Sequence, residues 1–279
     1  MYGGLACRML HVPQIANITG LGSVVENKGW LQKITIMLYK IGLKKTYRVF
    51  FQNEANRQFC LDHKMVNPSR QALIPGSGVN LQHHYLQDYP KEDQPLRFVF
   101  ISRLMKEKGI EQYLEVATRI KEKHPEMEFH IFGNSEEGYA ERVSLLQQQG
   151  VVVYHGYQND LRPFLAQYHC TVHPSFYPEG MSNVLLESCA AGRPIITTDR
   201  PGCREIVDDG VNGFVVRQRD ADDLEKKIEQ FISLPYHEKR QMGLNGRKKV
   251  ENGFDRRIVI DAYLSAIGEI EILKKRNNV

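Results

Sequence analysis

The sequence predicts an α/β fold organised around a doubly wound parallel sheet. Two observations support this: short runs rich in β-branched and aromatic residues recur along residues 95–216, and segments of helical periodicity separate them. Strands that alternate with helices at this spacing pair in parallel through βαβ units. The candidate strands are 96–102, 128–133, 151–156, 170–175, 194–199 and 213–216, and the candidate helices are 109–123, 137–149, 158–168 and 182–191.

The flanking segments extend this pattern. Residues 5–23 are expected to hold a helix, a strand and a loop, residues 47–60 the next strand and helix, and residues 71–80 a last strand. Residues 220–274 look helical throughout. Ligands of doubly wound sheets bind at the carboxyl ends of the strands, so we expect a site in the loops that follow the strands.

Composition bounds the class of protein. The chain has 279 residues, of which 42% are hydrophobic and 25% charged, and its formal charge of +4 does not argue for a nucleic-acid partner. No apolar run approaches the ~18 residues that span a bilayer, and the start lacks the pattern of a secretory signal. The five cysteines have no paired short spacing, so we expect reduced thiols in a cytosolic protein.

The most informative segment runs from Pro178 to Glu187. It places two carboxylates, Glu179 and Glu187, on either side of a turn and of the polar pair Ser182 and Asn183. An apolar run follows and ends at a glycine, which is typical of a loop, a helix and a helix C-terminus. The exposed N–H groups and dipole of a helix N-terminus favour an anion.

Glu187 is expected about one turn inside this helix, and its carboxylate then leans toward the helix N-terminus. Its neighbours are apolar. A carboxylate in such surroundings needs hydrogen-bond donors, and sugar or ribose hydroxyls could supply them. The apolar neighbours are Leu185, Leu186, Cys189 and Ala190.

Four segments together resemble the retaining nucleotide-sugar glycosyltransferases of the GT-B fold, specifically glycosyltransferase family 4 of the bacterial surface-glycan type. Glu179 and Glu187 match that family's signature of two glutamates separated by seven residues. The segment FVFISRLMKEKGIEQYLEVA matches its strand, basic loop and helix, with Arg103 and Lys108 as the two cations. FHIFGNSEE and PGCREIVDDGVNGFVV match two further segments, and the matches cover roughly residues 73–270.

The resemblance implies two Rossmann-like domains, the first incomplete and the second a complete doubly wound sheet. The predicted limits are a partial acceptor-side domain at 1–80, a nucleotide-sugar-binding domain at 81–255, and a helix at 256–279 that crosses back to the first domain. The shortened first domain leaves three interpretations open: a fragment of a longer protein, a shortened gene product, or half of a split enzyme.

The resemblance also assigns roles. Arg103 and Lys108 would stabilise the negative charge of a nucleoside diphosphate leaving group, Glu187 would bind ribose hydroxyls, and Glu179 would contact the transferred sugar. The alternatives are a solvated basic loop and surface carboxylates. Arg103, Lys108 and Glu179 are the predicted catalytic residues, and the predicted donor-binding residues are Gly78, Arg103, Lys108, Gly133, Tyr157, Glu179, Gly180, Met181, Ser182, Asn183, Val184 and Glu187.

The predicted reaction moves a sugar from a nucleoside diphosphate donor, most simply a UDP-sugar, to a glycan or lipid-linked acceptor with retention of configuration. The alternatives are a nucleotide-sugar-binding remnant without transfer activity, a chain that needs a partner chain, and an epimerase or phosphorylase on the same fold. No cofactor or metal is expected: the resemblance implies that none is required, and His83, His84, His155 and His173 lack metal-ligand spacing. The loop Thr19–Gly22 lacks the histidine that many members carry there.

Residues 28–48 give a separate signal. On a helical projection one face collects apolar side chains and the other lysines, as in helices that lie on anionic membranes. The alternative is an ordinary helix on the domain core. The functional interpretation predicts a cytoplasmic protein with peripheral contact at the inner face of the membrane. The apolar face holds Leu31, Ile34, Leu38 and Ile41, and the basic face holds Lys33, Lys40 and Lys44.

Overall fold

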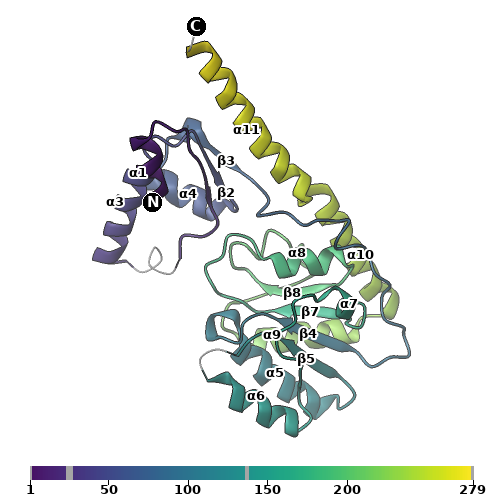
Figure 1. The fold of residues 1–279 in the computed structure, drawn as a ribbon. Coiled ribbons are helices and arrows are strands. Elements are labelled where there is room, and N and C mark those ends of the chain that lie inside the picture. Colours follow the sequence, from purple (N-terminus) through teal and green to yellow (C-terminus); the bar gives the residue numbers. More distant parts are fainter. Residues whose placement is uncertain (1, 23–27, 136–137, 278–279) are drawn as a thin grey trace. The chain divides into compact units, whose positions relative to one another are not determined.

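A computed structural model describes residues 2–22, 28–135 and 138–277 (Figure 1). The chain folds into two compact units. The described residues of Met1–Gly78, Pro178–Ser182 and Phe254–Val279 form the first unit, and Val79–Tyr177 with Asn183–Gly253 form the second. The predicted domain limits remain a prediction.

The second unit is built on a six-stranded parallel sheet with the order β6-β5-β4-β7-β8-β9. The first strand of this sheet in the sequence, β4, is central: the chain winds outward through β5 and β6, then returns to add β7 on the other side of β4. The point where the strand order reverses is called the switch point, and doubly wound sheets bind their ligands there. The strands are β4 (Arg97–Ile101), β5 (Glu128–Phe132), β6 (Val153–Tyr154), β7 (Cys170–His173), β8 (Ile195–Thr198) and β9 (Gly213–Val216).

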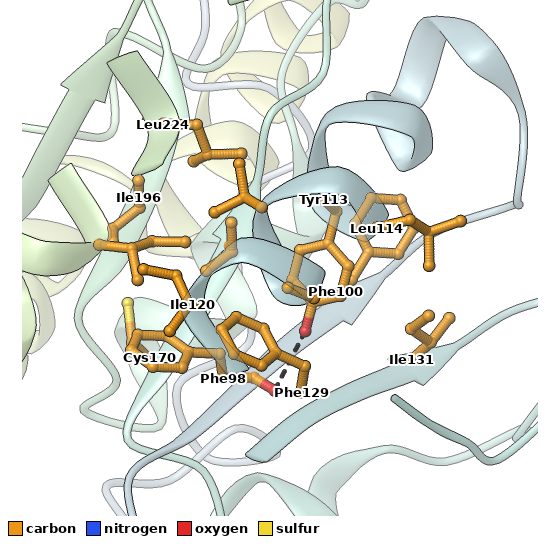
Figure 2. Packing of buried hydrophobic residues seen from close by; sticks show 14 of the residues in the cluster. Phe98, Phe100, Tyr113, Leu114, Ile120, Phe129, Ile131, Cys170, Ile196 and Leu224 are labelled. Carbon is orange, nitrogen blue, oxygen red and sulfur yellow. Dashed lines mark hydrogen bonds between the residues drawn. The ribbon is translucent and has the colours of Figure 1, made fainter. Parts of the chain in front are cut away.

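The main core of this unit lies between the sheet and its helices. Phe98 and Phe129, on neighbouring strands, stack with ring centroids 5.1 Å apart. Tyr113 is fully buried, and its hydroxyl donates to the carbonyl oxygen of Phe98 (3.2 Å; Figure 2) and to that of His130 (2.9 Å), which satisfies its one polar atom. The helices are α5 (Ile110–Lys123), α6 (Tyr139–Gln148), α7 (Arg162–Leu165), α8 (Asn183–Ala190), α9 (Ala221–Ser233) and α10 (Tyr236–Gly253), and Lys106–Lys108 form the 3-10 turn η2.

One helical prediction needs correction, and another is refined. The helix expected at 158–168 shrinks to α7, because the Asp160 carboxylate accepts the N–H of Arg162 (3.0 Å) and holds the preceding residues in a turn. Residues 220–274, expected to be helical throughout, form three helices separated by short breaks: α9, α10 and α11 (Arg256–Asn277). Pro235 lies at the break between α9 and α10, where it has no N–H to continue the helix. At the break between α10 and α11, the Asp255 carboxylate accepts the N–H of Arg257 (2.9 Å).

The first unit has a three-stranded parallel sheet of order β1-β2-β3. One face of β2 packs Val49 and Phe51 against α4, while Phe50 on the opposite face packs against Val259 of α11. This alternation follows the two-residue period of a strand. The elements are α1 (Tyr2–Met9), β1 (Ile15–Ile18), α3 (Trp30–Leu43), β2 (Arg48–Phe51), α4 (Glu54–Asp62), the 3-10 turn η1 (Pro68–Arg70) and β3 (Gln71–Leu73).

Helix α11 is fixed to this sheet by polar contacts as well. The Glu269 carboxylate accepts from the Tyr47 hydroxyl and from the Arg48 guanidinium, each at 2.9 Å. The predicted α/β class with two Rossmann-like sheets is therefore confirmed. In the described part of the chain, no helix combines the length and apolarity that a membrane crossing requires.

Candidate functional site

Two cations meet over one aromatic ring at the switch point of the second sheet. Arg103 follows β4, Lys108 ends η2, and Tyr177 lies in the loop after β7. The Lys108 ammonium is 4.7 Å from the centroid of the Tyr177 ring, and the Arg103 guanidinium carbon is 6.0 Å from it. The Phe176 N–H donates to the Glu107 carbonyl (2.8 Å), which ties the two loops together. The sequence predicted the cations and missed Tyr177.

The electrostatics of this corner favour an anionic ligand. Burial lowers the pKa of Lys108 to about 8, and the charge of Arg103 acts in the same direction, while the Cys203 thiol opposes it. Burial also lowers the pKa of His173 to about 3, with Lys108 contributing, so this imidazole is neutral. An anion placed beside Lys108 and Arg103 would relieve both the desolvation and the mutual repulsion of the two cations.

Glu187 lies in the second turn of α8, as predicted, with about a third of its side chain exposed. The Nε2 atom of His84 is 3.9 Å from its carboxylate. The backbone holds His84 there, because the Arg247 guanidinium donates to the His84 carbonyl (2.9 Å) and to that of Ala190 in α8 (2.8 Å). His84 was predicted to have a core or surface role. Its approach to Glu187 depends on long-range packing that no local pattern reveals.

Gly133 and Tyr157 follow β5 and β6 and so lie on the same edge of the sheet as Arg103. The Gly133 N–H donates to the Gly156 carbonyl (2.9 Å), and a Cβ on Gly133 would lie 1.8 Å from the Ser102 oxygen. The close approach of the chain after β4 thus explains this glycine. Tyr157 is 60% exposed and available to a ligand.

The residues from Glu179 to Ser182 belong to the first unit. The Asn53 side-chain amide donates to the carbonyls of Gly180 (2.6 Å) and Glu179 (3.2 Å). A Cβ on Gly180 would lie 2.0 Å from the Thr19 oxygen, so only glycine fits. Asn53, which also caps α4, was missed by the sequence reasoning.

Three further predicted donor-binding residues, Met181, Ser182 and Gly78, pack against other parts of the first unit. Met181 and Ser182 are buried, at 9% and 2% exposed, and a Cβ on Gly76 would meet the Met181 side chain. Gly78 packs against α11, where an added Cβ would lie 2.6 Å from the Arg256 Cα. Packing therefore explains why these residue types occur at these positions. Any contact that they make with a ligand would come from their backbone.

Two histidines of the second unit, His130 and His155, take part in a hydrogen-bonded chain. Arg97 and His130 both contact the Glu128 carboxylate, at 2.7 and 3.2 Å, and His130 Nδ1 is 2.9 Å from His155 Nε2. Within the described ranges, no group of three histidine, cysteine or acidic side chains is arranged to hold a metal ion.

With this geometry in place, comparison with known proteins identifies the family. The model of the family described as glycosyl transferases group 1 matches residues 83–249, more than half of the chain. The chain belongs to this family. The matched range contains both cations, Arg103 and Lys108, and both carboxylates, Glu179 and Glu187. The predicted enzyme class, a glycosyltransferase, is confirmed.

Relatives of this group 1 glycosyltransferase are themselves named as glycosyltransferases. N,N'-diacetylbacillosaminyl-diphospho-undecaprenol alpha-1,3-N-acetylgalactosaminyltransferase of Campylobacter jejuni is 26% identical over 94% of this chain and 72% of its own length. The lipopolysaccharide core biosynthesis glycosyltransferase LpsE of Rhizobium meliloti is 30% identical over 60% of this chain and 48% of its own. For LpsE and several other relatives, the chain spans about half of their length.

The fold comparison agrees. The structure of HepE from Anabaena in complex with UDP superposes with a TM-score of 0.80 at 16% identity, covering 96% of this chain and 75% of HepE. At this identity the match shows the fold alone, and it confirms the predicted GT-B architecture.

Proposed function

We propose that this group 1 glycosyltransferase moves a sugar from a UDP-sugar donor to a glycan or lipid-linked acceptor, with retention of anomeric configuration. The observation that carries the proposal is the pair Arg103 and Lys108 over Tyr177 at the switch point of the second sheet. The UDP complex of HepE and the diphospho-undecaprenol acceptor in the name of the Campylobacter relative support the donor and acceptor classes.

In this proposal, Arg103 and Lys108 stabilise the diphosphate as the glycosidic bond breaks. Negative charge grows on the leaving oxygen, and fixed cations there act most strongly on the transition state and the product. Loss of one such contact typically costs about 2–4 kcal/mol in the barrier. Because Lys108 is half-buried, its interaction with phosphate is screened less than that of a fully exposed lysine.

Glu187 is proposed to accept hydrogen bonds from the ribose hydroxyls, in keeping with its partly exposed carboxylate inside α8. Glu179 is proposed to contact the hydroxyls of the transferred sugar. Gly133 and Tyr157 are assigned to the base side of the donor, because they follow β5 and β6. The backbone of Gly78 and of the segment Gly180–Val184 completes the proposed donor-binding set.

Retention and metal independence belong to the same proposal. No second carboxylate is assigned as a nucleophile, so the leaving phosphate, held by Arg103 and Lys108, takes the acceptor proton in a same-face substitution. The two cations then supply the charge that a metal would otherwise provide. Assignment to glycosyltransferase family 4 and the domain limits at 80 and 255 are further parts of this proposal.

Calorimetric titration with UDP, followed by a transfer assay, tests the assignment. Arg103→Ala and Glu187→Gln should each weaken UDP binding at least about tenfold, equivalent to about 1.4 kcal/mol. Arg142→Ala is a matched control, since Arg142 is an exposed cation on α6. Wild-type UDP affinity in both site variants would refute the donor site.

A second candidate function is nucleotide-sugar binding without transfer. It is favoured by one observation: the site residues located above are assigned to the donor, and none of them to the acceptor. The same titration separates the two candidates. UDP binding that depends on Arg103 and Glu187, with no transfer to any acceptor, would support the binding function or the need for a partner chain.

Contact with an anionic membrane surface is proposed for residues 28–48, which would bring the enzyme to a lipid-linked acceptor. The exposed apolar face of α3 supports this proposal. The exposed side chains are Trp30, Leu31, Ile34, Met37, Leu38 and Ile41. Flotation with anionic liposomes at low salt tests it, and absence of co-flotation would count against it.

A further inference from the structure

A cavity of about 330 Å³ lies at the amino ends of the strands of the first sheet. Gln14, Tyr47 and Arg70 line it, and they directly precede β1, β2 and β3. The expected ligand edge of a parallel sheet is the opposite one, at the carboxyl ends. None of its described lining residues belongs to the proposed donor site, so the cavity requires a separate explanation.

The lining is basic. Arg8, His11, Lys45 and Arg70 contribute to it, and among the described residues no aspartate or glutamate does. In the part of the chain that the structure describes, Arg8, Lys45 and Arg70 form no ion pair with a carboxylate; the nearby Glu269 is engaged by Arg48. Three unit charges in such a setting attract an anion, most strongly at low ionic strength.

The polar groups of the cavity are arranged as donors. Arg8 donates one N–H to the Ile41 carbonyl (2.9 Å) and Arg70 donates one to the Thr46 carbonyl (3.4 Å), which fixes both guanidiniums and leaves their other N–H groups available. The Thr46 hydroxyl donates to the Gln14 side-chain oxygen (2.9 Å). The Gln14 amide therefore presents its NH2 group. A phosphate group, with several acceptor oxygens and negative charge, suits such a site.

The rim of the cavity is apolar and exposed. Helices α1 and α3 pack side by side, where a Cβ on Gly4 would lie 2.0 Å from the Gly42 oxygen (Figure 1). The cavity and the exposed face of α3 therefore belong to one packed piece. Val12 lines the cavity and is itself exposed. On the α1 side the exposed apolar side chains are Tyr2, Leu5, Met9, Leu10 and Val12.

We propose that this cavity binds the phosphate group of an anionic lipid headgroup while the rim of α1 and α3 rests in the lipid interface. A soluble phosphate matches the cations equally well, but only a lipid also accounts for the apolar rim. The inference rests on the membrane contact proposed for residues 28–48 and does not depend on the donor site. It adds a defined headgroup site to a contact otherwise attributed to the helix face.

Vesicle binding tests the proposal. The chain should bind vesicles of phosphatidylcholine with phosphatidylglycerol and bind pure phosphatidylcholine weakly. Each cavity cation removed should weaken binding about fivefold, the typical contribution of one basic residue at an anionic surface. Lys45→Gln is the cleanest variant, because the Lys45 side chain makes no hydrogen bond within the described residues, and Arg70→Gln is the second. Arg142→Gln, the same charge change on α6, should leave binding unchanged.

Several outcomes would overturn the assignment. Equal losses in Lys45→Gln and Arg142→Gln would mean diffuse attraction without a site. Calorimetric binding of inorganic phosphate that Lys45→Gln abolishes, without vesicle binding, would assign the cavity to a soluble phosphate. Binding to neither, with self-association in sedimentation, would indicate that a second copy covers the rim. UDP titration of each variant should match the wild type, so failure here is distinguishable from failure of the donor site.

Discussion

Tyr177 is one of the site residues that sequence reasoning did not find, and its role follows from its distances to the two cations. Its ring faces Lys108 at 4.7 Å and Arg103 at 6.0 Å, so its negative face offsets part of the repulsion between them. We expect Tyr177→Leu to weaken UDP binding about fivefold, the equivalent of about 1 kcal/mol of cation–π energy. Calorimetry measures this.

The control for this variant is Tyr177→Phe, which keeps the aromatic face and loses only the hydroxyl. It should bind UDP like the wild type. Equal losses in the leucine and phenylalanine variants would mean that the hydroxyl, and not the ring, matters at this position.

Lys108 makes donor binding depend on pH. Burial holds its pKa near 8, and only the protonated amine attracts diphosphate. UDP affinity should therefore decline as the pH rises above about 8, by up to about tenfold per pH unit, since one proton accompanies binding. Titration calorimetry between pH 6.5 and 9.5, about the range that brackets this pKa, measures the decline.

Lys108→Arg provides the matched comparison, because a guanidinium stays charged throughout this range. Its UDP affinity should change less with pH than that of the wild type. A wild-type affinity that stays flat through about pH 9 would show that Lys108 does not bind the diphosphate.

At the scale of elements, the buried histidines of the second sheet limit acid stability. Burial lowers the pKa of His169 to about 4 and that of His173 to about 3, and it lowers the pKa of His130 and His155 as well. The folded state resists protonation that the unfolded chain accepts near pH 6.5. Stability is therefore complete above about pH 6.5 and falls as the pH drops below it.

We expect the free energy of unfolding to fall by about 2 kcal/mol between about pH 7.5 and pH 5 for each fully buried histidine, by proton linkage. Denaturant unfolding at the two pH values checks this. His173→Leu should flatten the pH dependence, and His237→Gln, at a position on α10 near the surface, should leave it unchanged. A wild-type unfolding energy equal at both pH values would contradict the argument.

The elements also show which parts of a fold local patterns predict. Strands β4 to β9 carry short runs rich in β-branched and aromatic residues, and all six were predicted from those runs. The helix expected at 158–168 was wrong, because the Asp160 side chain competes for the backbone N–H of Arg162. The spacing of apolar residues does not show where a side chain competes with the backbone for a hydrogen bond.

At the scale of the whole chain, residues near in sequence were predicted and residues brought together by topology were not. Arg103, Lys108 and Glu187 each lie in a recognisable strand–loop–helix context. His84 reaches Glu187 across 103 positions of sequence, and Asn53 holds Gly180 across 127. No local signal marks such pairs. Gly78 and Gly133 were predicted as ligand contacts, while the structure explains both by close chain packing.

The last prediction concerns the charge balance of the reaction. If Arg103 and Lys108 neutralise the leaving diphosphate, sugar transfer needs no divalent cation. The transfer rate should be the same in EDTA and in added Mg²⁺ or Mn²⁺. In Lys108→Ala, where part of the fixed charge is lost, added Mg²⁺ should recover some of the rate, because a metal can replace the missing cation on the phosphates. A wild-type rate that EDTA abolishes and Mg²⁺ restores would place the charge stabilisation on a metal and not on these two side chains.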